Sequence, residues 1–318
     1  MSTKKKKYIH QKINFQRQNG TTSLYIACEN CHLQLVKLLL KYGPDTNLKN
    51  AAGKVPLHAS CYNNHIEVVR LLLDNKSTSV NVLDNKNISP LYATCQCSKG
   101  HFKVMELLLQ HGADVKNGKP PLIMTCTNGN TKMSEILIEK KADVNACVTD
   151  GVSPLFMACQ NSHYETVCLL LKSNADPNLH RVNRASPLMI ASQKGDMQIV
   201  EKLLKHECNI NSCTADGVSS LYLASQNGHF NVVSRLIEAG ANLNTSDEHG
   251  KTALFKACQN GHVDIVSMLL KSKSDAHLCM KNNVSPMTIA EKNKHLEVVS
   301  VLKRHEVDEK KLLWETFL

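Results

Sequence analysis

The sequence has few aromatic residues and no long apolar run. Aromatic residues make up 4% of the 318 residues, with Trp314 the only tryptophan, although hydrophobic residues make up 42%. Large globular domains usually bury many aromatic rings, so this composition favours a long and shallow core. No apolar run approaches the roughly 18 residues of a membrane-spanning helix, so no membrane span is expected. The N-terminal lysines are followed by no apolar stretch, so a secretory signal is not expected either.

Outside its N-terminus the sequence also carries little net charge. The formal net charge is +10, but Lys4–Lys7, Lys12 and Arg17 place +6 of it within residues 1–20, which contain no acidic residue. We interpret residues 1–18 as a disordered, solubilising tail. The alternative is a nuclear or nucleic-acid-associated factor that acts through Lys4–Lys7. Because no zinc-finger spacing or aromatic platform accompanies these lysines, nucleic acid is not the expected partner.

A repeated pattern accounts for most of the chain. A small residue, usually followed by proline, precedes an apolar residue at Thr22, Val55, Ser89, Pro120, Ser153, Ser186, Ser219, Thr252 and Ser285. The intervals between these positions are 33, 34, 31 and then five times 33 residues. Regular spacing of this length is typical of repeat proteins. It predicts nine repeats that start near residues 19, 51, 84, 117, 148, 181, 214, 247 and 280.

Each repeat has the pattern of two short helices and a loop. Ser153 is a candidate N-cap with proline at the first helical position. Leu155, Ala158 and Cys159 then lie on one face of a short helix, and a second apolar stripe at Val167, Leu170 and Leu171 follows. Helices this short are marginal in water when isolated. The repeats must therefore stack on one another to bury both stripes, which predicts a solenoid.

These residues resemble the ankyrin repeat. Val55-Pro-Leu-His58 is similar to the family's Thr-Pro-Leu-His signature, and Gly112-Ala-Asp-Val115 is similar to its loop ending. The resemblance covers residues 19–307 and implies an all-α-type repeat solenoid, a helix-turn-helix stack with β-hairpin fingers and a concave face. Residues 308–318 are expected to form an amphipathic C-terminal cap, although Leu312, Leu313 and Trp314 are also compatible with a short partner-binding motif.

The repeats depart from the family pattern at the signature histidine. Only His58 keeps it; the same position holds Tyr25, Tyr92, Ile123, Phe156, Met189, Tyr222, Phe255 and Thr288. Five of these residues are aromatic. We therefore expect packing to replace most of the hydrogen bonds that this histidine makes between repeats in the family.

The spacing of the cysteines and histidines resembles that of metal and haem sites, but these residues occupy equivalent positions of the repeats. Six cysteines occupy one small-residue position of the first helix: Cys28, Cys61, Cys95, Cys126, Cys159 and Cys258. Free cysteine packs as a small hydrophobic residue, so these are interpreted as core thiols. Cys28-Glu-Asn-Cys31-His32 has the spacing of covalent haem attachment, but its residues fill ordinary repeat positions. No cofactor or metal is therefore expected.

Seven of the histidines share another repeat position: His32, His65, His101, His163, His229, His262 and His295. A histidine row could suggest metal binding or pH sensing. By the family resemblance it is a turn residue of each repeat. No catalytic motif stands outside the repeat register, so the protein is not expected to be an enzyme.

Binding residues are inferred from the positions that the ankyrin family uses, the ends of the first helices and the finger tips. On the helices the candidates are Tyr62, Gln160, Asn161, Gln193, Lys194, Gln226, Asn227, Gln259 and Asn260. On the fingers they are Thr149, Asp150, Asn183, Asp216, Glu248, His249 and Lys251. Amide side chains both donate and accept hydrogen bonds, which suits recognition of another protein. The asparagines could alternatively serve only to end the helices.

The sequence thus predicts a non-enzymatic scaffold or adaptor, itself monomeric, that binds a protein partner through the concave face. An alternative is a substrate-recognition or regulatory subunit of a ubiquitin ligase or phosphatase complex, a role that many ankyrin proteins have. Because thirteen cysteines without expected disulfides suit a reducing compartment, we expect a cytoplasmic or nuclear location.

Overall fold

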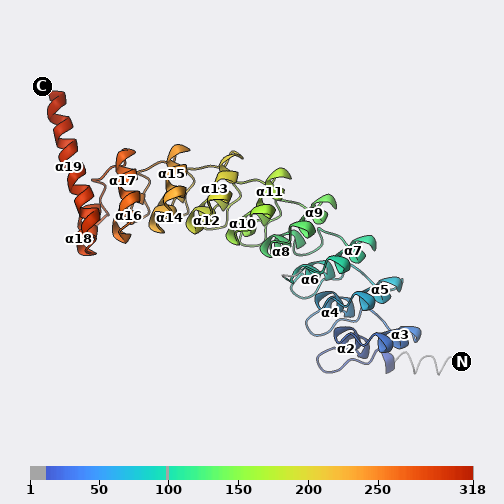
Figure 1. Cartoon of the computed structure of the whole chain (residues 1–318). Helices are drawn as coiled ribbons and strands as arrows, with labels where there is room; N and C mark the ends of the chain where they lie inside the picture. Colours follow the sequence, from blue (N-terminus) through green and yellow to red (C-terminus); the bar gives the residue numbers. More distant parts are fainter. Residues whose placement is uncertain (1–11, 98–99, 318) are drawn as a thin grey trace, which may run out of the picture. The chain divides into compact units, whose positions relative to one another are not determined.

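The structure is a computed structural model that describes residues 12–97 and 100–317, with side chains described within 12–97 and 100–311. The basic segment Lys4–Lys7 and the side chain of Trp314 lie outside these residues. The chain divides into two compact units, Met1–Val148 and Thr149–Leu318 (Figure 1). Each unit is a row of helix pairs.

The first unit contains α2 (Ser23–Glu29), α3 (Leu33–Lys41), α4 (Pro56–Tyr62), α5 (Ile66–Asp74), α6 (Pro90–Cys95), α7 (Phe102–Gln110), α8 (Pro121–Thr127) and α9 (Thr131–Glu139). The second contains α10 (Pro154–Gln160), α11 (Tyr164–Lys172), α12 (Pro187–Lys194), α13 (Met197–Leu204), α14 (Ser220–Gln226), α15 (Phe230–Glu238), α16 (Ala253–Asn260), α17 (Val263–Lys271), α18 (Pro286–Lys292) and α19 (Leu296–Phe317). Even-numbered helices are called inner helices below, and odd-numbered ones outer helices.

The inner helices begin where the sequence predicts. The Ser153 hydroxyl accepts a hydrogen bond from the backbone N–H of Phe156 at 3.1 Å. The same N-cap bond forms at Thr22, Ser89, Ser186, Ser219, Thr252 and Ser285. Val55 has no side-chain acceptor, and there the imidazole of His58 accepts from the Val55 backbone N–H at 3.2 Å instead. Each cap satisfies a backbone group that a helix start leaves unpaired.

Within each unit the inner helices stack directly on one another and carry the core. Leu155, Phe156, Ala158 and Cys159 are almost completely buried, and their equivalents recur in the other repeats. All six cysteines of the small-residue position are buried, which confirms their interpretation as packing residues. Burial raises the pKa of Cys61 to about 12, so its thiol stays protonated. Each outer helix packs on its own inner helix, so the core is one layer deep.

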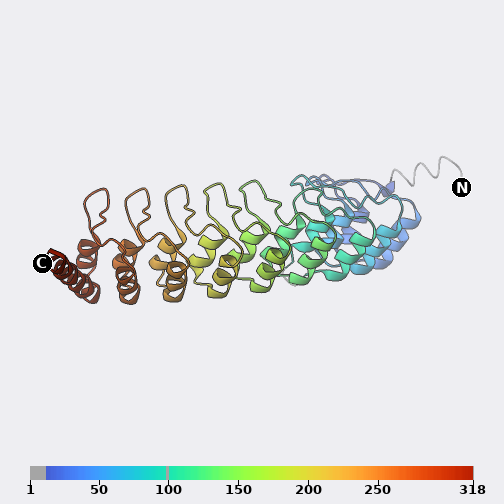
Figure 2. The same ribbon diagram turned by 90° about the horizontal axis from the view of Figure 1, so that it is seen from above.

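In the part of the chain that the structure describes the fingers are loops, and the expected β-hairpins are not confirmed. In the second unit they project to one side of the helices (Figure 2). Four of these loops close with a short-range backbone bond, such as Asp247 N–H to the carbonyl of Lys251 at 2.9 Å. Within the described residues the only bridges are the isolated pairs Cys213–Ser219 and Ser246–Thr252. The hairpin part of the predicted fold is therefore not confirmed, because one bridge per loop does not make a strand ladder.

The last helix is longer than every other outer helix. The outer helix α17 ends at Lys271, whereas α19 spans Leu296–Phe317 without interruption. The segment expected to form a separate cap thus continues the outer helix of the final repeat.

Candidate partner-binding surface

The candidate glutamines lie in the last turns of four consecutive inner helices. Gln160 and Gln226 are the final residues of α10 and α14, and Gln193 and Gln259 are the penultimate residues of α12 and α16. Each glutamine is the seventh residue after the N-cap of its helix, so the regular N-cap sets where it lies. Gln160 and Gln193 are exposed, and Gln226 and Gln259 are half-buried. The predicted row therefore exists within the second unit.

The backbone carbonyls of this row hold adjacent repeats together. The Gln193 carbonyl accepts hydrogen bonds from Asn227 Nδ2 at 2.8 Å and His229 Nε2 at 2.9 Å. Gln226 accepts in the same way from Asn260 and His262, and Gln259 from Asn293 and His295. We call each such set a rung. A rung holds the backbone carbonyl of the glutamine and does not use its side-chain amide.

The rungs give the turn histidines and the neighbouring asparagines a definite role. Asn63 and His65 make a rung to the Glu29 carbonyl in the first unit, at 3.1 and 2.9 Å. Asn227 and Asn260 therefore do more than end their helices, because one amide group of each bonds to the preceding repeat. Sequence reasoning missed this, although the repeated Asn-x-His spacing was visible. Polar bonds between repeats are thus kept, at a position other than the signature histidine.

The side chains of Lys194 and Asn161 bond to nearby backbone. Lys194 Nζ donates to the Gln160 carbonyl at 2.7 Å, across one repeat. Asn161 Nδ2 donates to the Met157 carbonyl within its own helix at 3.2 Å. Gln160 therefore receives a contact from the next repeat as the other three glutamines do, but from a lysine.

The finger tips of the second unit are joined through their backbone. Val182 N–H donates to the Asp150 carbonyl, and the same bond recurs from Ala215 to Asn183, Glu248 to Asp216 and Lys281 to His249, at 2.9–3.0 Å. Through these bonds the predicted tip residues of neighbouring fingers lie along one edge of the second unit. Thr149, Asn183, Asp216, Glu248 and His249 are exposed on it, and Asp150 and Lys251 are half-buried. Asp150 is also engaged by an ion pair with Arg181.

A polar cluster connects a finger to the glutamine row. The Tyr222 hydroxyl donates to Asp247 Oδ2 at 2.9 Å, and Lys256 Nζ donates to Gln259 Oε1 at 2.8 Å. Burial, and then the bond to Asp247, raise the pKa of Tyr222. Burial and the nearby Lys251 lower the pKa of Lys256, which Asp247 partly offsets. Sequence reasoning missed Tyr222, Asp247 and Lys256 because it treated each repeat separately.

Tyr62, the aromatic candidate, lies in the first unit at the edge of a small pocket. The pocket has a volume of about 200 Å³, and its lining includes Tyr25, Glu29, Lys54 and His58. The Tyr62 side chain is 55% exposed. Aromatic residues beside a pocket are common anchors in protein interfaces. Tyr62 is not close in sequence to the glutamine row and belongs to a different unit.

The cysteines and histidines do not gather into a metal site in the described part of the chain. There, no group of three or more His, Cys, Asp or Glu side chains is placed to hold a metal ion. Cys28 is buried in the core, whereas Cys31, of the haem-like string, is exposed in the turn with a φ of 57°. Among the described helices, none is long and apolar enough to cross a membrane.

Comparison with known proteins identifies the repeat. A search of curated proteins found no match to the chain. The family model described as ankyrin repeats, in three copies, matches residues 5–84, 42–117, 92–181, 174–247 and 240–312. These overlapping matches cover nearly all of the sequence, in agreement with the stacked helix pairs and the 33-residue spacing. The chain therefore belongs to the ankyrin-repeat family.

Proposed function

We propose that the protein is a non-enzymatic scaffold that binds a protein partner across the finger tips and the glutamine row of its second unit. Ankyrin repeats are in general modules for protein–protein interaction. The face proposed for binding is the one that the family resemblance expects to be concave. Finger tips and inner-helix ends contribute to it from successive repeats.

The main support is that contacts between repeats on this face use mainly backbone carbonyls as acceptors and not the exposed side chains. The rungs and the bonds between finger tips engage backbone carbonyls at Gln193, Gln226, Asn183 and Asp216. The side chains of Gln160 and Gln193 are exposed beside the tip side chains and can contact another molecule, whereas the Gln259 amide already accepts a hydrogen bond from Lys256. A face whose backbone is held in place loses little conformational entropy on binding, which favours affinity.

The spacing of the row suits an extended, polar partner segment. Consecutive inner helices in contact lie about 8–10 Å apart, so four glutamines offer hydrogen bonds at regular steps along the stack. An amide can pair with a backbone N–H or with a carbonyl. The row can therefore hydrogen-bond to a partner's backbone whatever the partner's side chains are. The charged finger tips would add selectivity.

The test replaces Gln160, Gln193, Gln226 and Gln259 by glutamate. The change removes the amide donors and adds repulsion among four carboxylates, but leaves the backbone rungs intact. Proteins captured by the wild-type chain are identified by mass spectrometry and their direct binding to both purified chains is measured. We expect the variant to bind at least about tenfold more weakly, because a loss of this size corresponds to about one hydrogen bond.

The matched control changes two exposed glutamines on outer helices, Gln34 and Gln198, to glutamate. This variant should bind the same partner as well as the wild type does. Helicity of all three chains is compared by circular dichroism. If the partner binds the four-site variant with unchanged affinity, the glutamine row is not its binding site. If both variants weaken binding equally, the effect is general electrostatics and the proposal fails.

A further inference from the structure

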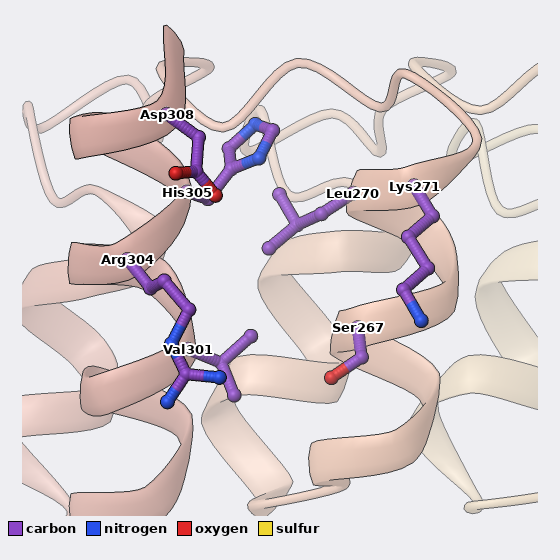
Figure 3. Close-up of a pocket in the computed structure, with 7 residues that line it drawn as sticks. All are labelled: Ser267, Leu270, Lys271, Val301, Arg304, His305 and Asp308. Carbon is purple, nitrogen blue, oxygen red and sulfur yellow. The ribbon is translucent and has the colours of Figure 1, made fainter. Parts of the chain in front are cut away.

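A groove lies between the outer helices α17 and α19, outside the surface proposed above. Its volume is about 310 Å³, and it is lined by Ser267, Leu270, Lys271, Val301, Arg304, His305 and Asp308 (Figure 3). Leu270 is buried and Val301 half-buried, so they form an apolar floor. The remaining lining residues are polar or charged and surround this floor.

The two helices that border the groove differ in length. The chain leaves α17 after Lys271 through Ser272 and the left-handed Lys273, with a φ of 68°. At the equivalent point α19 continues, so His305 and Asp308 extend past the end of α17. In Figure 3 these two residues lie at one end of the groove, next to Leu270. An added repeat at this end would remove the feature.

Two positive charges face each other across the groove. Lys271 and Arg304 occupy the same position in consecutive repeats, 33 residues apart. In Figure 3 the Arg304 guanidinium and the Ser267 hydroxyl lie toward the space between the helices, and the Lys271 side chain runs along α17. Over the described residues, neither cation is in an ion pair. Like charges placed this way repel each other unless an anion lies between them.

The negative groups nearby do not neutralise the groove. Asp308 is the one carboxylate in its lining. Glu309, the next residue, is 3.3 Å from both His305 and His277 and is engaged by them. Glu309 is not part of the lining, whose fixed charges are two positive, on Lys271 and Arg304, and one negative, on Asp308. One further carboxylate would balance it.

We propose that this groove binds an acidic side chain of a peptide segment in a protein partner. The guanidinium of Arg304 can hold a carboxylate with two parallel hydrogen bonds, Lys271 adds a point charge and Ser267 adds a donor. The floor of Leu270 and Val301 accepts the hydrocarbon part of that side chain or of an apolar neighbour. A free inorganic anion would leave this floor exposed to water.

The charge count selects a carboxylate over a phosphate group. A phosphate monoester carries nearly two negative charges and would leave the lining, with Asp308, negative overall. A carboxylate leaves it neutral. This site is independent of the glutamine row, and either can be correct without the other.

The probe is a short fluorescein-labelled peptide that alternates leucine and glutamate, compared with its leucine–glutamine counterpart by fluorescence anisotropy. The full-length chain should bind the glutamate peptide at least about tenfold more tightly than the glutamine peptide, as expected when a charge-assisted hydrogen bond is lost. The double variant Lys271→Gln, Arg304→Gln should lose this preference. Lys303→Gln is the control, because Lys303 is exposed on the same helix and does not line the groove.

Methyl resonances of Leu270 and Val301 locate the peptide independently of its affinity, and they should shift on addition of the glutamate peptide. The proposal is overturned if the two peptides bind equally, if neither binds, or if Lys303→Gln weakens binding as much as the double variant. It is also overturned if a phosphoserine peptide binds more than tenfold better than the glutamate peptide, which would assign a dianion to the groove.

Discussion

The rung between α14 and α16 allows a quantitative test of how the repeats are held together. Gly228 ends α14 with a φ of +77°, and a Cβ added there would lie 2.7 Å from Cε1 of the His262 ring. His262 in turn donates to the Gln226 carbonyl at 3.1 Å. The glycine thus meets two requirements, a left-handed backbone and room for the histidine of the next repeat.

These two requirements can be separated by substitution. Gly228→Ala should cost about 1–2 kcal/mol for the left-handed backbone and about 1–3 kcal/mol more for the contact with His262. His262→Ala removes one hydrogen bond, at a cost of about 0.5–1.5 kcal/mol. In the His262→Ala background the contact term disappears. Gly228→Ala should then cost only its backbone term, so the two substitutions are coupled by at least about 1 kcal/mol.

Gly240 provides the control, since its φ is +87° and an added Cβ would meet nothing within 4 Å. Gly240→Ala should cost the backbone term alone, whether or not His262 is present. Urea unfolding of the full chain gives the free energies, and amide hydrogen exchange in α14 and α16 locates the loss. If Gly228→Ala costs the same in both backgrounds, or no more than Gly240→Ala, the proposed contact does not limit this position.

Two further predictions concern buried polar groups. The hydroxyl of Ser225 is buried without a hydrogen-bond partner among the described residues, so Ser225→Ala should raise the free energy of unfolding by about 1 kcal/mol; an unchanged or lower urea midpoint would contradict this. Burial lowers the pKa of His58. Its neutral ring accepts a hydrogen bond from the Val55 backbone N–H and donates one to the Ile88 carbonyl. The contribution of His58 to stability is therefore present at neutral pH and is lost as the pH falls through the lowered folded-state pKa. The wild type should therefore lose more stability than His58→Gln as the pH falls from about 6.5, and parallel pH profiles of the two unfolding free energies would refute this.

Much of the fold could be predicted because its determinants are local. The N-cap hydroxyls act three residues away, and the cysteine position follows from helix periodicity within one repeat. Ser192 and Ser225 also fill that position, and the structure leaves both hydroxyls buried without a described partner, which explains why cysteine is a good residue there. The helix pairs were therefore visible in the sequence alone.

The contacts that the sequence did not predict all join two repeats. Tyr222 reaches Asp247 of the next finger, and Asn227 reaches the carbonyl of Gln193. A repeat pattern says which residues are equivalent but not which side chains of neighbouring copies meet. The fingers were predicted as hairpins from the family resemblance, yet the loops have too few bridges for strands. The groove between α17 and α19 depends on where the last helix ends, and periodicity carries no information about that.

The rungs also determine how the protein would respond to a pulling force. Asn227 and His229 bond to a carbonyl 34 and 36 residues earlier, so this rung joins only neighbouring repeats. A repeat that detaches from the end therefore releases only its own length, about 110 Å of extended chain. Its neighbour keeps its own rung until the force reaches it. Within the second unit, repeats would therefore detach one at a time, each step releasing nearly the same length of chain, and could reattach in reverse order.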